Sequence, residues 1–192
     1  MRRLTSVVVT LALLPGAGVA RAQGRWSLEA SAGAAFATQK LGEADLGTGV
    51  GLDLIGRYRF MPHLSAYAGW DWHHFPSDDP VAGGDADFED TGYTFGMRFE
   101  HPFAGKTSYW LRLGGTAKHI EVENGEGDII SDTGHGLGWE AGAGMTIPIG
   151  TRTMLTPGVR YRALSRDLEV GSASTPVDLK YVNVGLGLAY RF

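Results

Sequence analysis

The chain has 192 residues, which is the length of one ordinary domain. Its 29 glycines are about twice the share usual in soluble proteins, and it contains no cysteine. The formal net charge of −4 excludes a broad basic surface of the kind that nucleic-acid binding requires, so no nucleic-acid partner is expected. The absence of cysteine fits an exported chain that a hydrogen-bonded sheet stabilises in place of disulfides.

The first 22 residues predict a secretory signal peptide. Arg2 and Arg3 supply a positive start, residues 7–14 form a short apolar run, and residues 20–22 (Ala-Arg-Ala) match a small-x-small cleavage site. We expect cleavage after Ala22, which leaves residues 23–192 as a single domain. The apolar run is too short to cross a bilayer as a helix, which takes about 20 residues. An uncleaved anchor is the alternative.

Downstream of this signal, apolar and polar residues alternate with a period of two, without a sustained helical period. The pattern predicts eight strands, near residues 26–37, 48–60, 64–73, 93–100, 109–118, 134–147, 155–163 and 182–192. A tilted membrane strand needs about 9–11 residues, which strands of this size supply. No later segment predicts a transmembrane helix. A membrane-embedded chain of this kind must therefore close its sheet, because lipid offers no partner for open backbone groups.

The connections between the predicted strands alternate in length. Residues 38–47, 76–89, 121–132 and 165–176 form long polar loops, and the other connections are short turns. This alternation is typical of transmembrane barrels, which have long outer loops and short periplasmic turns. The sequence therefore predicts an all-β fold, an eight-stranded antiparallel up-and-down transmembrane β-barrel in the bacterial outer membrane, with both ends of the barrel in the periplasm.

Periodicity alone leaves open which face meets lipid, because a soluble sandwich or lipocalin-like barrel would bury the apolar face. The signal peptide favours the membrane, and charges avoid the middle of the apolar face, where Arg or Lys costs about 2–4 kcal/mol. Aromatic residues also cluster toward strand ends, as interface girdles do. The expected girdles contain Trp26, Phe60, Phe99, Trp110, Tyr190 and Phe192 on the periplasmic side, and Phe36, Trp70, Trp72, Trp139 and Tyr181 on the outer side.

The opposite face carries the charged residues, spaced by glycines, and an eight-stranded barrel has an interior filled by side chains. We expect a lumen ion-pair network of Glu29, Asp53, Arg57, Arg59, Asp71, Arg98, Glu100, Arg112, Glu140, Arg160, Arg162 and Arg191. Counting back from the turn near Gly150 places Glu140 opposite Arg160 or Arg162. Asp53 falls opposite Asp71, so a cation has to lie between them, from Arg57 or from an arginine on another strand, or one of the two has to keep its proton.

The final segment, Tyr181-Val-Asn-Val-Gly-Leu-Gly-Leu-Ala-Tyr-Arg-Phe192, resembles the last strand of a known outer-membrane β-barrel family. That family includes the transmembrane domain of outer-membrane protein A, outer-membrane protein X and the opacity adhesins. The resemblance implies that Tyr190 and Phe192 form a barrel-insertion signal read by the insertion machinery. Two departures predict bulges. Pro157 removes a ladder donor, and Val177 and Leu179 are out of phase with Val182, which indicates another bulge or a loop boundary near Lys180.

The six histidines invite a catalytic or metal interpretation. His119 and His135 are expected to face each other near the outer rim. Such a pair could bind a divalent metal or sense pH, but we favour the simpler interpretation that they are two polar residues of the rim. His63-Leu64-Ser65 has the His-x-Ser spacing that resembles a lipid A deacylase. The outer rim offers the residue types of an acyl-transfer site in His73, His74, Ser77 and Asp78, without an oxyanion-hole signature. We expect no enzyme, catalytic residue, metal or cofactor.

The function expected from these observations is a structural or surface-interaction role, adhesin-like, with the four loops presenting the binding surface. One alternative is a narrow channel for small solutes, and the other is a lipid A-modifying acyl hydrolase or acyltransferase. The expected partners are outer-membrane lipid, lipopolysaccharide and the barrel-insertion machinery. The sequence identifies no extracellular ligand.

Overall fold

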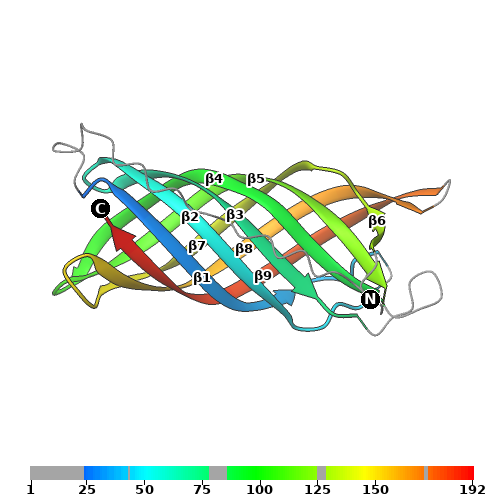
Figure 1. Cartoon of the computed structure of the whole chain (residues 1–192), viewed down its shortest axis with the longest axis horizontal. Coiled ribbons are helices and arrows are strands. Elements are labelled where there is room, and N and C mark those ends of the chain that lie inside the picture. Colours follow the sequence, from blue (N-terminus) through cyan, green and yellow to red (C-terminus); the bar gives the residue numbers. More distant parts are fainter. Residues whose placement is uncertain (1–23, 43, 78–85, 125–128, 171–172) are drawn as a thin grey trace, which may run out of the picture.

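The computed structural model describes residues 24–42, 44–77, 86–124, 129–170 and 173–192, so the predicted signal peptide lies outside the described residues (Figure 1). The described part is built of strands alone: β1 (Trp26–Ala37), β2 (Gly49–Met61), β3 (Leu64–Phe75), β4 (Ala86–Ala104), β5 (Thr107–Asn124), β6 (Ile129–Asp132), β7 (Gly136–Pro148), β8 (Thr153–Val170) and β9 (Ala173–Arg191). Among the described residues, none lies in a helix of the length and hydropathy that crossing a membrane requires.

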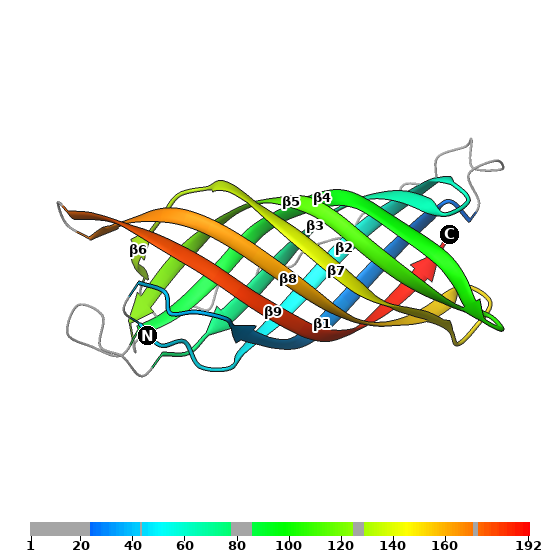
Figure 2. The same cartoon turned by 180° about the vertical axis from the view of Figure 1, so that it is seen from behind.

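Eight of the strands close into an antiparallel barrel. Each barrel strand pairs with its neighbours in the chain, β1 pairs with β9, and the pairing of β4 with β5 joins the two ends of the hydrogen-bonded order. Figure 2 shows β8, β9 and β1 side by side, strongly tilted. The ninth strand, β6, is short and pairs with β5 beyond the point where β7 leaves it. The predicted eight-stranded barrel is therefore confirmed, with β6 as an addition within the predicted loop 121–132.

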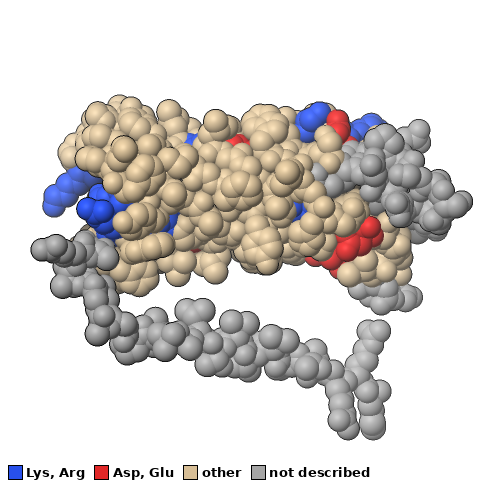
Figure 3. Space-filling view, turned by 90° about the horizontal axis from the view of Figure 1, so that it is seen from above, with Lys and Arg blue, Asp and Glu red and all other residues tan. Residues whose placement is uncertain are grey.

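The two faces of the barrel differ in polarity as expected for a membrane protein. Large apolar side chains point outward, and Leu113 and Leu137 are 64% and 76% exposed. The middle of the barrel surface carries almost no charge, while charged side chains lie toward its two ends (Figure 3). Inward-facing residues alternate with these and carry the charges. This arrangement fits hydrocarbon around the barrel and contradicts a soluble barrel, whose apolar residues would be inside.

Several strands are longer than the sequence pattern predicts. β8 and β9 pair continuously from Thr153↔Tyr190 to Val170↔Ala173, so most of the predicted loop 165–176 is a hairpin. β4 begins at Ala86 and β5 continues to Asn124, inside the predicted loops 76–89 and 121–132. The physical reason is that strands beyond the bilayer are hydrated on their outer face. Their polar composition therefore looks like that of a loop, although the backbone ladder continues.

Neither predicted bulge forms. The register of β8 with β9 runs unbroken through Pro157↔Leu186 and Ala163↔Lys180. On its other side, Pro157 interrupts the ladder with β7, which resumes in the same register between Gly144↔Gly158 and Ile147↔Leu155. Leu179 is in phase with the inward-facing residues of β9 because it packs inside the barrel, not against lipid.

The predicted assignment of two aromatic residues to the lipid girdles is wrong. Trp110 and Tyr181 are fully buried in the lumen, whereas Trp26, Phe60, Phe99, Tyr190 and Phe192 and, at the other end, Phe36, Trp70 and Trp139 are exposed on the outside. Trp72 is half-buried, with its indole N–H donating to Glu89 Oε2 at 2.8 Å. A Cβ at Gly144 or Gly158 would lie about 2.5 or 2.4 Å from the Trp110 ring. The two glycines therefore make the space that this indole fills.

Candidate functional site

The middle of the lumen holds a network of charged side chains, which we call the lumen network. It contains equal numbers of opposite charges: the six carboxylates of Glu29, Asp53, Asp71, Asp90, Glu100 and Glu140, and the six cationic groups of Arg57, Arg98, Arg112, Lys118, Arg160 and Arg162. All are buried except Glu100, which is half-buried. Such a set is tolerable in a narrow lumen because each charge has a partner of opposite sign.

Glu140 is the most heavily contacted carboxylate. Its Oε2 accepts from Nε of Arg162 at 3.1 Å, the cross-strand neighbour on β8. Its Oε1 accepts from the hydroxyls of Tyr67 at 2.6 Å and Thr94 at 2.5 Å, and from the guanidinium of Arg112. Glu140 thereby connects five strands around the barrel.

The facing pair of Asp53 and Asp71 is bridged by cations from other strands. Asp53 Oδ1 accepts from Arg162 Nη2 at 2.5 Å, and Nη2 also lies 3.7 Å from Asp71 Oδ2. Arg160 approaches Asp53 Oδ2 at 2.5 Å, and Lys118 forms an ion pair with Asp71. The bridging residue is therefore an arginine of β8 and not Arg57. Arg57 lies farther along the lumen, 3.5 Å from Glu29 and 3.6 Å from Glu100.

The structure separates Arg59 and Arg191 from the other ten residues that were grouped with them. Arg59 is exposed at the end with the short turns and donates to the carbonyl of Gly24 at 2.9 Å. Arg191 is half-buried, and its Nη2 lies 3.5 Å from the sulfur of Met154. Within the described part of the chain, the acceptors nearest these two guanidinium groups are neutral. We therefore place both outside the lumen network.

Four buried residues on the long-loop side of the lumen, Asp90, Lys118, His73 and Tyr181, are absent from the predicted ion-pair network. Asp90 accepts from Lys118 Nζ at 2.7 Å and from the Tyr181 hydroxyl at 2.6 Å, and His73 Nε2 lies 2.9 Å from Arg162. Asp90 directly follows the predicted loop 76–89, and Tyr181 was assigned to lipid. Strand parity was the signal that finds them, since Tyr181 shares the phase of the inward-facing Asn183.

Beyond this network, the long-loop end of the lumen is filled by apolar side chains, which we call the apolar plug. It consists of Ala35, Leu41, Ala44, Phe75, Phe88, Ile120, Val122, Leu164, Leu179 and Tyr181, all buried. Leu41 and Ala44 come from the predicted outer loop 38–47, where they pair with each other through backbone hydrogen bonds. Part of this loop therefore folds into the mouth of the barrel.

The candidate histidine sites are placed as follows. The rings of His119 and His135 stack with centroids 4.4 Å apart, and the Nδ1 and Nε2 atoms of His119 lie 3.2 Å from Asp132 and 3.6 Å from Glu121. Each ring nitrogen of His119 thus faces a different carboxylate, which fits a polar rim. His73 is buried in the lumen, while His74 lies on the other face near Asp87 and Glu89. Asp78 falls outside the described residues.

His63 and Ser65 both lie at the end with the short turns and line a cavity there. The Nδ1 atom of His63 contacts the backbone carbonyl of Glu100 at 2.8 Å. This contact occupies the nitrogen that, in an acyl-transfer site, an orienting carboxylate side chain would hold.

A closed antiparallel barrel that is apolar outside and charged inside is an integral membrane β-barrel. The chain belongs to the outer membrane protein beta-barrel domain family, whose model matches residues 6–192. Such proteins reside in the outer membrane of Gram-negative bacteria, among its lipids and lipopolysaccharide.

Solved structures with the same fold include Neisserial surface protein A, with 15% identity, a TM-score of 0.62, and coverage of 87% of this chain and 97% of that chain. The attachment invasion locus protein Ail of Yersinia pestis has 18% identity, a TM-score of 0.54, and coverage of 88% and 99%. Outer membrane protein W of E. coli has 14% identity, a TM-score of 0.57, and coverage of 90% and 100%. At these identities the likeness concerns the fold alone. No curated protein matches the sequence.

Proposed function

We propose that this protein has a structural and surface-interaction role in the outer membrane, adhesin-like, with the long-loop end facing outside. The observation that carries the proposal is the filled lumen. Arg162, Lys118, Glu140 and Asp71 are each 0% exposed in its middle, and the apolar plug occupies its long-loop end. A barrel filled in this way leaves its outer surface and ends as the parts available for contact.

Strand β6 supplies a specific feature of that end. It pairs with β5 and with no other described strand, and its Ile129 and Ile130 are 57% and 46% exposed. Apolar side chains exposed at the outer end of the barrel offer a surface for contact with another chain. Two of the similar structures belong to proteins named for the cell surface and for attachment, which supports the same role.

Binding by whole cells tests the role. Bacteria that display the protein are applied to surfaces coated with fibronectin, laminin or purified lipopolysaccharide, and are compared with cells that lack it. We expect several-fold greater retention on at least one surface, and loss of that gain in the double variant Ile129→Ser/Ile130→Ser. The matched control is Ile149→Ser, an equally apolar residue on a short turn at the other end, 55% exposed. Equal retention by cells with and without the protein contradicts the proposal.

The filled lumen also argues against the narrow-channel alternative. Purified protein in planar bilayers is expected to give no stable openings, and steady single-channel currents would restore that alternative. The geometry likewise argues against a lipid A hydrolase or acyltransferase site at His73, which is sealed in the lumen, and at His63, whose Nδ1 is occupied by a carbonyl. Mass spectrometry of lipid A from cells with and without the protein should show identical acyl chains.

Two features of the chain ends belong to the same proposal. Residues 1–22 are a cleaved signal peptide, which predicts Gln23 as the first residue of the protein isolated from membranes and is checked by N-terminal sequencing. Tyr190 and Phe192, whose rings meet edge to face at 5.3 Å on the outside of the barrel, form the signal for the insertion machinery. Phe192→Ala is expected to reduce the amount assembled in the outer membrane. The control is Phe103→Ala, an exposed aromatic at the same end.

A further inference from the structure

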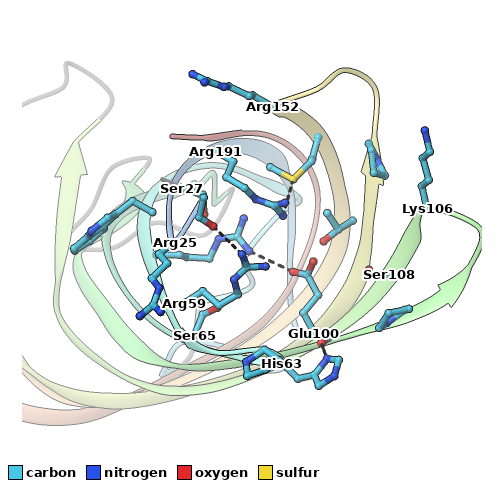
Figure 4. Close-up of a pocket in the computed structure, with 18 of the residues that line it drawn as sticks. Arg25, Ser27, Arg59, His63, Ser65, Glu100, Lys106, Ser108, Arg152 and Arg191 are labelled. Atoms are coloured by element: carbon cyan, nitrogen blue, oxygen red, sulfur yellow. Dashed lines mark hydrogen bonds and ion pairs between the residues drawn. The ribbon is translucent and has the colours of Figure 1, made fainter. Parts of the chain in front are cut away.

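The end of the barrel with the short turns contains a cavity, which we call the short-turn cavity (Figure 4). Its volume is about 540 Å³, within the range of sites for small organic molecules. The lumen network forms its floor through Arg57 and Glu100, and the turns at residues 62–63 and 150–152 contribute to its rim. The cavity is thus separated from the apolar plug by the whole charged layer.

The charge of this cavity is strongly unbalanced. Its lining includes Arg25, Arg57, Arg59, Lys106, Arg152 and Arg191, against a single carboxylate from Glu100. In Figure 4, Arg152 and Lys106 lie out at the rim, whereas Arg191 and Glu100 face the mouth from opposite walls. Glu100 Oε2 is already within 3.1 Å of Arg98 and 3.6 Å of Arg57, so its charge is shared with the network.

The three inner arginines retain hydrogen-bonding capacity. Arg59 and Arg191 contact a backbone carbonyl and a thioether, and neither provides a counter-charge. Arg57 is buried, and its Nε has no hydrogen-bond partner among the described groups. The lumen network is already neutral without Arg59 and Arg191. Their charge therefore remains available to a ligand instead of holding the barrel together.

The donors around these guanidinium groups suit an oxyanion. The hydroxyls of Ser27, Ser65 and Ser108 line the same cavity and add neutral donors. Guanidinium forks bind phosphate oxygens in pairs, and the resulting charge-assisted hydrogen bonds are shorter and stronger than neutral ones. A cation is repelled here, and an apolar ligand would leave the guanidinium groups of Arg59 and Arg191 without a counter-charge.

We propose that the short-turn cavity is a binding site for a small phosphate-bearing organic molecule that enters from the short-turn end of the barrel. Arg59 and Arg191 hold the phosphate oxygens, and the serine hydroxyls face the remainder of the ligand. The site stands independently of the surface role proposed above, because the two occupy opposite ends of the barrel. A phospholipid headgroup carries the same chemistry as a soluble phosphate ester, so the test has to distinguish these sources.

Calorimetric titration tests the site on protein purified from outer membranes in an alkyl maltoside, which brings no phosphate. The soluble probe is glucose 6-phosphate, with glucose as its uncharged control, and the lipid probe is dioctanoyl-phosphatidylglycerol. The variants are Arg59→Gln and Arg59→Gln/Arg191→Gln, and the matched control is Lys180→Gln, a cation at the long-loop end. Each variant is shown to be folded by its faster migration on gels before heating than after heating. If the double variant does not fold, the single variant Arg59→Gln is used alone.

Saturable binding of glucose 6-phosphate but not glucose is expected, weakened about tenfold or more by Arg59→Gln and unchanged in Lys180→Gln. Saturation by dioctanoyl-phosphatidylglycerol alone, with the same dependence on Arg59, also supports the site and assigns the phosphate to a lipid headgroup. Absence of binding by both probes overturns the proposal. Affinities equal in the wild type and in the Arg59→Gln variant overturn it as well, since the bound anion then lies elsewhere.

Discussion

The middle of the lumen and its short-turn end are built from the same residue types, yet they use charge differently. In the middle, six cationic groups meet six carboxylates, and Glu140 alone contacts Arg112, Arg162, Tyr67 and Thr94. At the short-turn end, Arg59 and Arg191 face neutral acceptors. Buried charges whose partners are fixed hold a structure in place, whereas charges that lack a partner leave interaction energy for a ligand.

The largest effect should come from breaking the centre of the paired region. Glu140→Ala leaves Arg112 and Arg162 without their shared carboxylate inside the barrel, and is expected to lower the free energy of unfolding by about 3–5 kcal/mol. Urea unfolding in detergent micelles, followed by tryptophan fluorescence, measures the change. Asp178→Asn, which removes half of the exposed pair with Lys180 at 3.2 Å, should cost less than about 1 kcal/mol. Similar losses in the two variants would contradict the distinction between middle and periphery.

A smaller loss of stability is expected when a single hydroxyl is removed from the same region. Thr94→Val keeps the shape of the side chain but removes the donor to Glu140 Oε1, so a loss of about 1.5–3 kcal/mol should appear in the same unfolding measurement. Ser108→Ala is the counterpart in the lining of the short-turn cavity and should change stability by less than about 0.5 kcal/mol. The comparison fails if the cavity hydroxyl proves as costly to remove as the network hydroxyl.

The smallest effect on stability is expected where the proposed binding is strongest. Arg59→Gln removes an exposed charge without a carboxylate partner in the described structure, and the free energy of unfolding should stay within about 0.5 kcal/mol of wild type. A loss of more than about 1 kcal/mol in urea would mean that Arg59 serves the barrel itself. A stable fold combined with lost phosphate binding would separate the two uses of charge in one residue.

The sequence predicts the barrel because the period of two persists through every strand and the connections alternate in length. The errors arise where side-chain type was preferred over phase. Trp110 has the same parity as Arg112, and Tyr181 the same parity as Asn183, so both belong inside although aromatic residues are common at the membrane interface. The hairpin register places Asp53 opposite Asp71 correctly. It does not predict Arg162 between them, because contacts across a lumen depend on strand tilt and stagger, which local pattern does not encode.

The spread of partners around Glu140 has a consequence for how the chain reaches its membrane. Its contacts come from four strands, β3, β4, β5 and β8. Glu29 of β1 and Asp53 of β2 also pair with arginines of β8, so part of the barrel inserted by itself would carry unpaired charges into hydrocarbon until the last strand meets the first. Assembly is therefore expected to be concerted, with closure and insertion occurring together and partial barrels too costly to accumulate.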